Sequence, residues 1–417
     1  MLSPLVTPPP LKMGLGNWVS GPEHFFRREE EISDLRELLV DGESVMLVAP
    51  RRAGKTSLLH EVARHLPLQQ YHCLHLDLEA ATSPAGFFHE LARAGRHLAS
   101  LRAKLLDFVT NIAGPLAELH SEHLALRLGE LFDAGWQDRA ERLFARIAEL
   151  PERSIFFVDE VPLFFLRLIE SDSHGRDVVE GFLSLLRSTA QRYRGRIQFV
   201  IAGSIGLVPL LQRLGLSAAI NHYVAFELRP WNRATVCNCL RALGARYGLA
   251  FMADAEAKVA DLLGVGVPHH VQLFFAELRV HARRGNVTSI FPDDVDEVYR
   301  NAMLARAHQH LSHMHERLKD VFVVTGEMPL VEAILAAAAN TKAIDWIELL
   351  QLAGTRDGAI TPTDLQRIVD ILVHDGYLMC AGDDAYSFVP GYVRDWWRRQ
   401  HSAEQRISRR LNLETST

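Results

Sequence analysis

Short apolar runs alternate with longer amphipathic stretches over the first 230 residues of the chain. Each run lacks a regular polar alternation, which is the pattern of a strand buried on both faces of a parallel sheet. The stretches between the runs carry apolar residues at helical spacing. Strands that alternate with helices predict an α/β fold with a doubly wound parallel sheet. The runs are residues 44–49, 71–78, 154–160, 197–203 and 222–228.

Helical periodicity accounts for most of the remaining sequence in this half of the chain. A helix is expected over residues 24–42, and another opens at Lys55, directly after the first apolar run. Residues 84–150 show Leu/Ala periodicity with few breakers and are predicted to be helical throughout. The apolar face of the first helix consists of Phe25, Ile32, Leu35, Leu38 and Leu39.

The character of the sequence changes after Pro230. Residues 231–315 carry mainly helical patterns, and three further helices then precede a hairpin with its turn at residues 382–384. Three helices followed by a two-stranded wing are typical of the winged-helix domain. The predicted organisation is therefore an N-terminal arm at 1–22, an α/β core at 23–230, a helical lid at 231–315 and a winged-helix domain at 316–417.

Composition places the chain among ordinary globular proteins. Its 417 residues suggest two to three domains, and its net charge of -6 argues against a uniformly basic nucleic-acid-binding surface. The four cysteines form no CxxC pair, which fits a reducing compartment. The Pro-rich start lacks the pattern of a signal peptide, and no apolar run is long enough to span a bilayer. We expect a cytoplasmic protein without a membrane partner.

The stretch "LVAPRRAGKTSLL" nearly matches the phosphate-binding loop G-x-x-x-x-G-K-[ST]. Gly54 permits a tight turn, Lys55 is placed to reach the β- and γ-phosphates, and Thr56 supplies a hydroxyl to Mg²⁺. Ala49 replaces the first glycine. Alanine is a modest departure if φ at this position is negative, and a serious one if φ must be positive.

A second motif, which ends in two acidic residues, follows the third apolar run. "IFFVDE" ends in Asp159 and Glu160, the form of a Walker B segment, in which the aspartate holds Mg²⁺ and the glutamate polarises the attacking water. The alternative is a strand that ends in two solvated acids. Ser204, at the end of the fourth run, either senses the γ-phosphate or belongs to a plain turn.

Four segments together resemble the AAA+-like P-loop ATPases of the archaeal-type ATPase and STAND group, which are kin to origin-recognition ATPases. "FFRREEEISDL" is similar to the F-x-G-R-E-x-E-L box, with Arg27 in place of its glycine. "APRRAGKTSLL" and "FFVDE" are similar to the two nucleotide motifs, and "GVPHHVQLF" is similar to the G-x-P-x-x-x-Q segment of the helical lid. The resemblance spans residues 20–400 and is weak through 84–150.

This resemblance implies bound ATP or ADP with Mg²⁺ and assigns further residues to the site. Phe25, Arg28 and Glu29 would lie near the adenine, Pro268 would pack on the base, and His269 or His270 would reach a phosphate from the lid. Lys55, Asp159, Glu160 and Ser204 are the expected catalytic residues, with Thr56 and Asp159 as the Mg²⁺ ligands. The expected nucleotide-binding residues are Pro50, Arg51, Arg52, Ala53, Gly54, Lys55, Thr56, Ser57, Phe25, Arg28, Pro268 and His269.

Arginines and histidines elsewhere admit two interpretations each. Arg51 and Arg52 either contact phosphates or a neighbouring subunit, or are merely solvated. A histidine group on one predicted helix spans too wide an arc for one metal site, so a polar helix surface is the better interpretation. Candidate arginine fingers are Arg213, Arg229 and Arg233, and the histidines are His308, His310, His313 and His315.

The C-terminal region carries mixed signals about DNA. Basic residues beside Trp396 and Trp397 would suit nucleic acid, but packing of both tryptophans inside the domain is the favoured alternative. The expected recognition helix contains Asp364, Asp370 and Asp375 against Arg367 and His374, which is acidic for a helix that enters a major groove.

Three classes of function remain open from the sequence. The first is an ATP-hydrolysing switch that couples nucleotide state to self-association or to a protein partner. The second is a DNA-bound AAA+ ATPase with a loader or mobile-element role, which would use the winged helix. The third is a nucleotide-binding scaffold that does not hydrolyse ATP.

Overall fold

The structure is a computed structural model that describes residues 11–16, 18–21, 23–113, 121–132, 135–171, 173–203, 206–322, 326–354, 360–382, 384–389 and 391–400. The chain divides into two compact units. We call residues 28–49 and 55–228 the core unit. The second, here called the C-terminal unit, comprises residues 229–417 together with 1–27 and the loop segment Pro50–Gly54.

A five-stranded parallel sheet forms the centre of the core unit, and its order is β2-β3-β4-β1-β5. All five predicted strands are confirmed, and the predicted α/β fold with them. β3 and β4 have almost continuous burial, because helices cover both faces of the sheet. The strands are β1 (Val45–Val48), β2 (Tyr71–Asp77), β3 (Arg153–Asp159), β4 (Ile197–Ala202) and β5 (Val224–Glu227).

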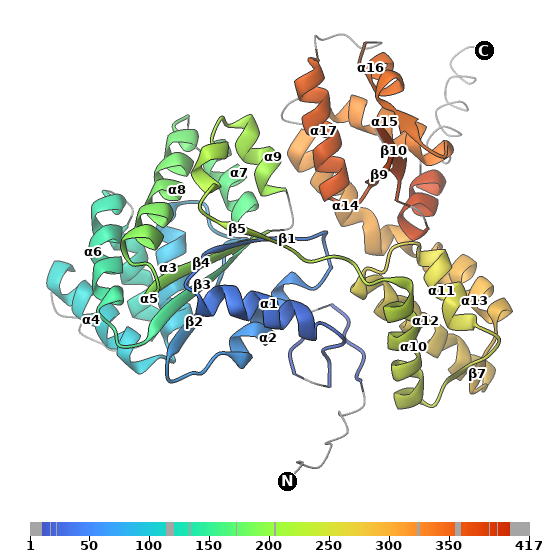
Figure 1. Ribbon diagram of the computed structural model, residues 1–417, viewed down its shortest axis with the longest axis horizontal. Helices are drawn as coiled ribbons and strands as arrows, with labels where there is room; N and C mark the ends of the chain where they lie inside the picture. The colour runs from blue at the N-terminus through green and yellow to red at the C-terminus, as the bar shows by residue number, and fades with distance from the viewer. Residues whose placement is uncertain are drawn as a thin grey trace. The chain divides into compact units, whose positions relative to one another are not determined.

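Helices flank the sheet on two sides (Figure 1). α1 (Glu29–Val40) and α2 (Lys55–His65) pack together on one face. The apolar core of the opposite face is contributed largely by the helices between β2 and β5. These are α3 (Pro84–Gly95), α4 (Ala99–Ala113), α5 (Ser121–Leu131), α6 (Trp136–Ala148), α7 (Val161–Ser171), α8 (Gly175–Arg192) and α9 (Leu207–Arg213), with a 3₁₀ turn at Ser217–Ile220.

The predicted start of the first helix is wrong. α1 begins at Glu29 rather than at residue 24, and Phe25 lies before it. Arg27 has a φ of 44°, in the left-handed region, which an α-helix cannot include. The predicted face is otherwise confirmed, because Ile32, Leu35 and Leu39 are buried.

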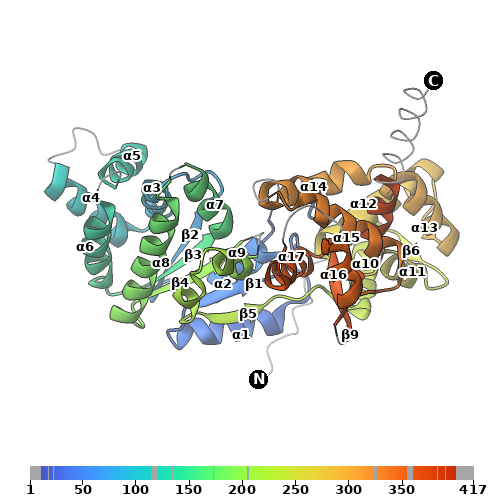
Figure 2. The same ribbon diagram turned by 90° about the horizontal axis from the view of Figure 1, so that it is seen from above.

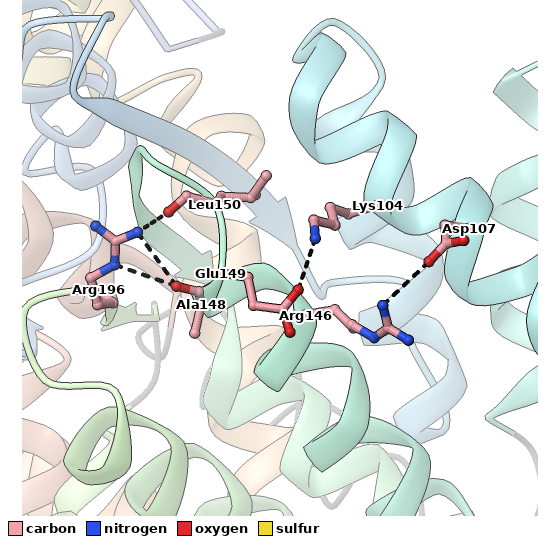
Figure 3. Close-up of polar contacts among 7 residues, drawn as sticks. All are labelled: Lys104, Asp107, Arg146, Ala148, Glu149, Leu150 and Arg196. Carbon is pink, nitrogen blue, oxygen red and sulfur yellow. Dashed lines mark hydrogen bonds and ion pairs between the residues drawn. The ribbon is translucent and has the colours of Figure 1, made fainter.

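The helical segment between β2 and β3 is held together by ion pairs at its surface (Figure 3). Lys104 of α4 pairs with Glu149 at 2.8 Å, and Arg146 of α6 lies 3.5 Å from Asp107. These groups are largely exposed, so the pairs contribute little to stability. The same helical segment also buries apolar side chains, among them Phe87, Phe88 and Phe144.

Arg196, just before β4, fixes the end of α6 to the sheet. Its guanidinium donates to the carbonyl oxygens of Ala148 and Leu150 (Figure 3). The last carbonyls of a helix have no partner within the helix, and a cation is favourable at that end. Arg196 therefore satisfies carbonyl groups at the C-terminal end of α6 and links that end to β4.

The C-terminal unit contains a helical group that follows β5 along the chain. It comprises four α-helices and a two-stranded parallel sheet that the sequence did not predict. The helices are α10 (Arg233–Tyr247), α11 (Ala255–Leu263), α12 (Pro268–Gly285) and α13 (Pro292–Val298), the strands are β6 (Ala250–Phe251) and β7 (Ser289–Ile290), and a π-helical turn spans Tyr299–Met303.

The last part of the described chain begins with α14, and the predicted three helices and hairpin follow, with a further short strand. Figure 2 labels the four helices. The sheet order is β8-β10-β9, and both pairings are antiparallel. The elements are α14 (Ala307–Phe322), α15 (Met328–Asn340), β8 (Ile344–Asp345), α16 (Trp346–Gly354), α17 (Pro362–His374), β9 (Leu378–Gly382) and β10 (Ala385–Phe388). Among the described residues, no helix is both long and apolar enough to cross a bilayer.

A histidine stack lies between α2 and the sheet. The rings of His60 and His75 are 3.8 Å apart at 16°, and His75 lies 4.8 Å from the ring of Phe157 at 12°. Burial, together with the smaller effect of the neighbouring His60, lowers the pKa of His75 to about 3. The folded protein therefore keeps His75 neutral.

We predict that His75→Phe reduces the acid sensitivity of folding. The folded pKa lies below the ordinary value of 6.5, so the unfolded chain takes up the proton first as the pH falls. His75 should thus cost about 2 kcal/mol of stability between pH 8 and pH 5, and the phenylalanine should remove that loss. Urea unfolding at both pH values measures the difference. Equal pH dependence in wild type and variant would contradict the prediction.

Candidate functional site

The phosphate-loop motif lies between β1 and α2, at the carboxyl end of a strand bordered by β4 and β5. Gly54 has a φ of 95°, which requires glycine or strain. Ala49 is buried and is not among the described residues with a positive φ. The alanine in place of the first glycine therefore imposes no backbone strain, and the loop keeps its turn.

Lys55 begins α2, and its side chain is almost completely buried. Its ammonium Nζ donates to the carbonyl oxygen of Ala49 at 3.1 Å. The first N–H groups of α2 have no partners within the helix, so they and the ammonium form an electropositive anion site. The lysine charge is thus held within the loop, where phosphate oxygens bind in sites of this type.

Thr56 and Asp159 bring the two nucleotide motifs together. The Thr56 hydroxyl Oγ1 donates to Oδ2 of Asp159 at 2.6 Å, and Oδ1 of Asp159 accepts from the backbone N–H of Glu160 at 3.0 Å. Burial raises the pKa of Asp159, and the charge of Glu160 adds to this, while the bond from Thr56 and the nearby Lys55 act in the opposite direction. A hydroxyl and a carboxylate are the hard oxygen ligands that suit Mg²⁺.

Glu160 has a φ of 58°, an uncommon conformation for a residue other than glycine. It lies between the end of β3 and the first residue of α7, and its carbonyl oxygen accepts from the N–H of Phe164. A left-handed residue of this kind costs on the order of 1–3 kcal/mol and is found preferentially at functional sites. The strain fixes the direction in which the second acid leaves the strand.

Arg52 connects the phosphate loop to α12 within the C-terminal unit. It adopts a left-handed φ of 62°, and its Nη1 donates to Nε2 of His269. Burial lowers the pKa of the Arg52 guanidinium below its usual value. Of the two lid histidines, His269 is therefore the one at the loop. His270 is buried, with its ring 5.4 Å from that of Tyr392.

The other residues predicted for the nucleotide site differ in position and in burial. Pro268 occupies the first turn of α12, and Arg28 is buried with its guanidinium bonded to Glu31. Phe25 is half-buried just before Arg27, whose left-handed φ explains why the resembling motif has glycine there. Ser204 lies outside the described residues. Pro50, Arg51 and Ser57 are half-buried in or beside the loop, and Ala53 is buried.

The candidate arginine fingers all lie on exposed positions. Arg233 pairs with both carboxylate oxygens of Asp261, at 2.7 and 3.0 Å. Arg213 is the last residue of α9, and Arg229 follows β5. The bidentate pair would have to break if Arg233 acted as a finger in trans.

The C-terminal tryptophans confirm the packing interpretation. Trp396 and Trp397 are buried, and the ring of Trp397 contacts Tyr377, Phe388 and His315. The side chains of His310 and His313, and residues 401–417, lie outside the described residues. Within the part of the chain that is described, no group of three or more His, Cys, Asp or Glu side chains is placed to hold a metal ion.

The sequence missed the contacts made by the N-terminal arm. The N–H of Gly14 donates to Oε1 of Gln272, and the N–H of Met13 donates to the hydroxyl of Tyr247, both at 3.2 Å. Leu11 is buried as well. Gln272 belongs to the lid segment "GVPHHVQLF", but neither its motif nor the irregular arm reveals a contact between residues so far apart in the chain.

We predict that Asp159→Asn raises the melting temperature of the nucleotide-free protein at pH 7. The pKa of Asp159 in the folded protein lies above the ordinary 3.8. Ionisation of this carboxyl group therefore destabilises the fold as the pH rises from the pKa of the unfolded chain to that of the folded protein. The amide removes this cost. The gain should shrink at pH 4 and below, where the wild-type carboxyl group becomes protonated in both states.

Thr56→Val is the matched control for this measurement. It deletes the hydroxyl donor and leaves the carboxylate in place, so it should lower the melting temperature at pH 7. Scanning calorimetry of both variants across the pH range tests the pair. A lower melting temperature for Asp159→Asn at pH 7 would refute the stated role of burial.

Comparison with known proteins gives a result at the level of the fold. The sequence matches no family model and no curated relative. The Walker-type ATPase of Pyrococcus abyssi is similar in structure, with a TM-score of 0.58 and 20% identity, over 90% of this chain and 97% of that one. The ORC2 protein of Aeropyrum pernix, solved as ADPNP–ADP complexes, has a TM-score of 0.51 and 12% identity, over 93% and 97%.

Identities this low establish architecture alone. The five-stranded parallel sheet with helices on both faces belongs to this architecture. The chain therefore shares the α/β fold of these two proteins.

Proposed function

We propose that the protein binds ATP with Mg²⁺ and hydrolyses it as an AAA+/STAND-type molecular switch. The observation that carries the proposal is the 2.6 Å hydrogen bond from Thr56 to Asp159. It joins the two side chains that we expect to bind the same Mg²⁺ ion, the hydroxyl of Thr56 and the carboxylate of Asp159. The ammonium of Lys55 lies in the same loop. A strand that merely ended in solvated acids would not make this bond.

Each residue has a distinct chemical task in this proposal. Lys55 and the N-terminal N–H groups of α2 hold the β- and γ-phosphates. Thr56 and Asp159 are the protein ligands of Mg²⁺, which would neutralise charge on the phosphate oxygens. Glu160 orients the attacking water and accepts its proton. The left-handed φ of Glu160, at the junction of β3 and α7, supports this role because such residues occur preferentially at functional sites.

The contact between Arg52 and His269 provides the switch. Phosphate oxygens would compete with His269 for the Arg52 guanidinium, because a charged acceptor binds a guanidinium more strongly than a neutral imidazole does. Nucleotide binding would thereby change the contact between the loop and α12. The resulting movement of α12 would alter a surface for self-association or for a protein partner.

The C-terminal helices and three-stranded sheet have the element order of a winged helix, which we propose as their identity. A protein partner suits this module better than DNA does. Arg367 of α17 is tied to Glu327 in a nearly buried ion pair, and Asp364 and Asp370 are half-buried on the same helix. The helix that would enter a major groove therefore offers little free positive charge.

We predict that Lys55→Ala weakens ATP binding by about 10- to 100-fold. A hydrogen bond to a charged group contributes about 1.5–3 kcal/mol, and each 1.4 kcal/mol is tenfold in affinity. Lys104→Ala removes a surface lysine paired with Glu149 and is the matched control, with unchanged affinity expected. Calorimetric titration measures both. Unchanged affinity in Lys55→Ala would refute the assignment of the loop.

We predict that Glu160→Gln retains ATP binding and loses turnover by about 10²- to 10⁴-fold, the usual contribution of a general base. Phosphate release under saturating ATP measures the loss. Turnover of the wild type with and without duplex DNA separates the alternatives. Strong stimulation by DNA favours the loader role, and retention of ADP without turnover favours a non-hydrolysing scaffold.

A further inference from the structure

The two-stranded parallel sheet of the C-terminal unit has one buried face. β6 and β7 pair in register, Ala250 with Ser289 and Phe251 with Ile290. Ile290 is completely buried, and the ring of Phe251 lies 6.5 Å from that of Phe275 in α12. Because side chains alternate along a strand, the residues on either side of this buried pair point to the opposite face of the sheet.

That opposite face is apolar and exposed. Met252 directly follows β6, and Val287 and Phe291 lie two residues before and after Ser289. The backbone N–H of Met252 donates to the carbonyl oxygen of Ile290 at 2.9 Å, which continues the strand register and places Met252 opposite Phe291. Met252, Val287 and Phe291, here called the outer apolar face, are 42, 42 and 49% exposed. Parallel sheets are almost always covered on both faces, so this one lacks a cover within the described part of the chain.

Charges of opposite sign flank the outer apolar face. Because the strands are parallel, their amino ends lie at one end of the sheet and their carboxyl ends at the other. Arg246 precedes β6, and Arg283 and Arg284 precede β7. Asp254 follows β6, and Asp293 follows β7. All five side chains are exposed, so the sheet has a basic end and an acidic end.

We propose that this face is an interface between two copies of the chain, packed face to face about a twofold axis with their strands antiparallel. The basic end of each copy then lies opposite the acidic end of the other, and the two contacts are equivalent. Parallel strands would instead bring arginines against arginines. Lys258 and Asp296, on the adjoining helices, pair with each other at 3.1 Å and add no net charge. A surface with one sign at each end is complementary to itself, which selects a second copy as the occupant.

The interface gives a location to the self-association in the proposed function, and in this respect the inference rests on that proposal. α12 joins the two sites: His269, near its start, contacts the phosphate loop, and Gly285, its last residue, precedes β7. The pairing itself requires no nucleotide. The test therefore uses nucleotide-free protein, and its failure is distinct from a failure of ATP binding.

Charge reversal at each end of the sheet tests the proposal by sedimentation velocity of the full chain. The wild type should form a dimer at about 0.1 mM, within the range of weak protein association. Arg283→Glu with Arg284→Glu, and separately Asp254→Lys with Asp293→Lys, should each raise the dimer dissociation constant about 10-fold or more, because like charges then face each other. Mixed together, these two double variants should form a heterodimer about as tightly as the wild type pairs, since opposite charges again meet at both contacts.

The matched control is Arg36→Glu with Arg142→Glu. It makes the same change in net charge at two exposed positions of the core unit and should leave the dissociation constant unchanged. A wild type that stays monomeric at about 0.1 mM overturns the proposal. A mixture of the two reversed variants that associates no better than either variant alone also overturns it.

Phe291→Ser serves if a charge variant does not fold. Phe291 is the N-cap of α13, where serine is a preferred residue, so this variant should keep its melting temperature. It should nevertheless raise the dimer dissociation constant about 10-fold or more, because a large aromatic side chain leaves the centre of the interface. Unchanged association in Phe291→Ser would show that the outer apolar face is not the interface.

Discussion

The hydrogen bond between Thr56 and Asp159 is the contact on which the whole site depends. It forms because parallel strands present their carboxyl ends at one edge of the sheet, so the loop after β1 and the acid after β3 lie close together. Asp159 pairs in register with Asp77 of β2, and Val158 with Ile201 of β4. The sheet therefore sets the position of the acid, and α2 sets that of the hydroxyl.

Left-handed backbone recurs in the segments that carry the predicted nucleotide motifs. Arg27, Arg52 and Glu160 all have positive φ values, and none of them is glycine. Each costs on the order of 1–3 kcal/mol, which the buried core on both faces of the sheet must offset. The three residues lie in the box before α1, in the phosphate loop and after β3. The other described non-glycine residues with positive φ, namely Ala253, Asp254, Asn286 and Asp384, lie outside these motifs.

Within the C-terminal unit, the loop segment Pro50–Gly54 contacts the start of α12. Arg52 contacts His269, and His270 packs beside Tyr392, whose hydroxyl donates to the carbonyl oxygen of Met303. A movement at the start of α12 would therefore be transmitted through the contact between His270 and Tyr392 to the helical segment that carries Trp396 and Trp397. On α17, Arg367 is tied to Glu327, so that helix offers little free positive charge.

The sequence by itself determined the five strands, their alternation with helices, and the motifs that follow β1 and β3. These features are local: apolar runs, helical periodicity and fixed spacings of Gly54, Lys55 and Thr56 are visible without long-range contacts. Only the tertiary structure decided the start of α1 at Glu29, the strain-free Ala49, the pairing of Trp231 with Phe26 and the place of His269 beside Arg52. Backbone dihedrals and contacts between distant segments depend on how the chain packs, and no periodicity in the sequence records them.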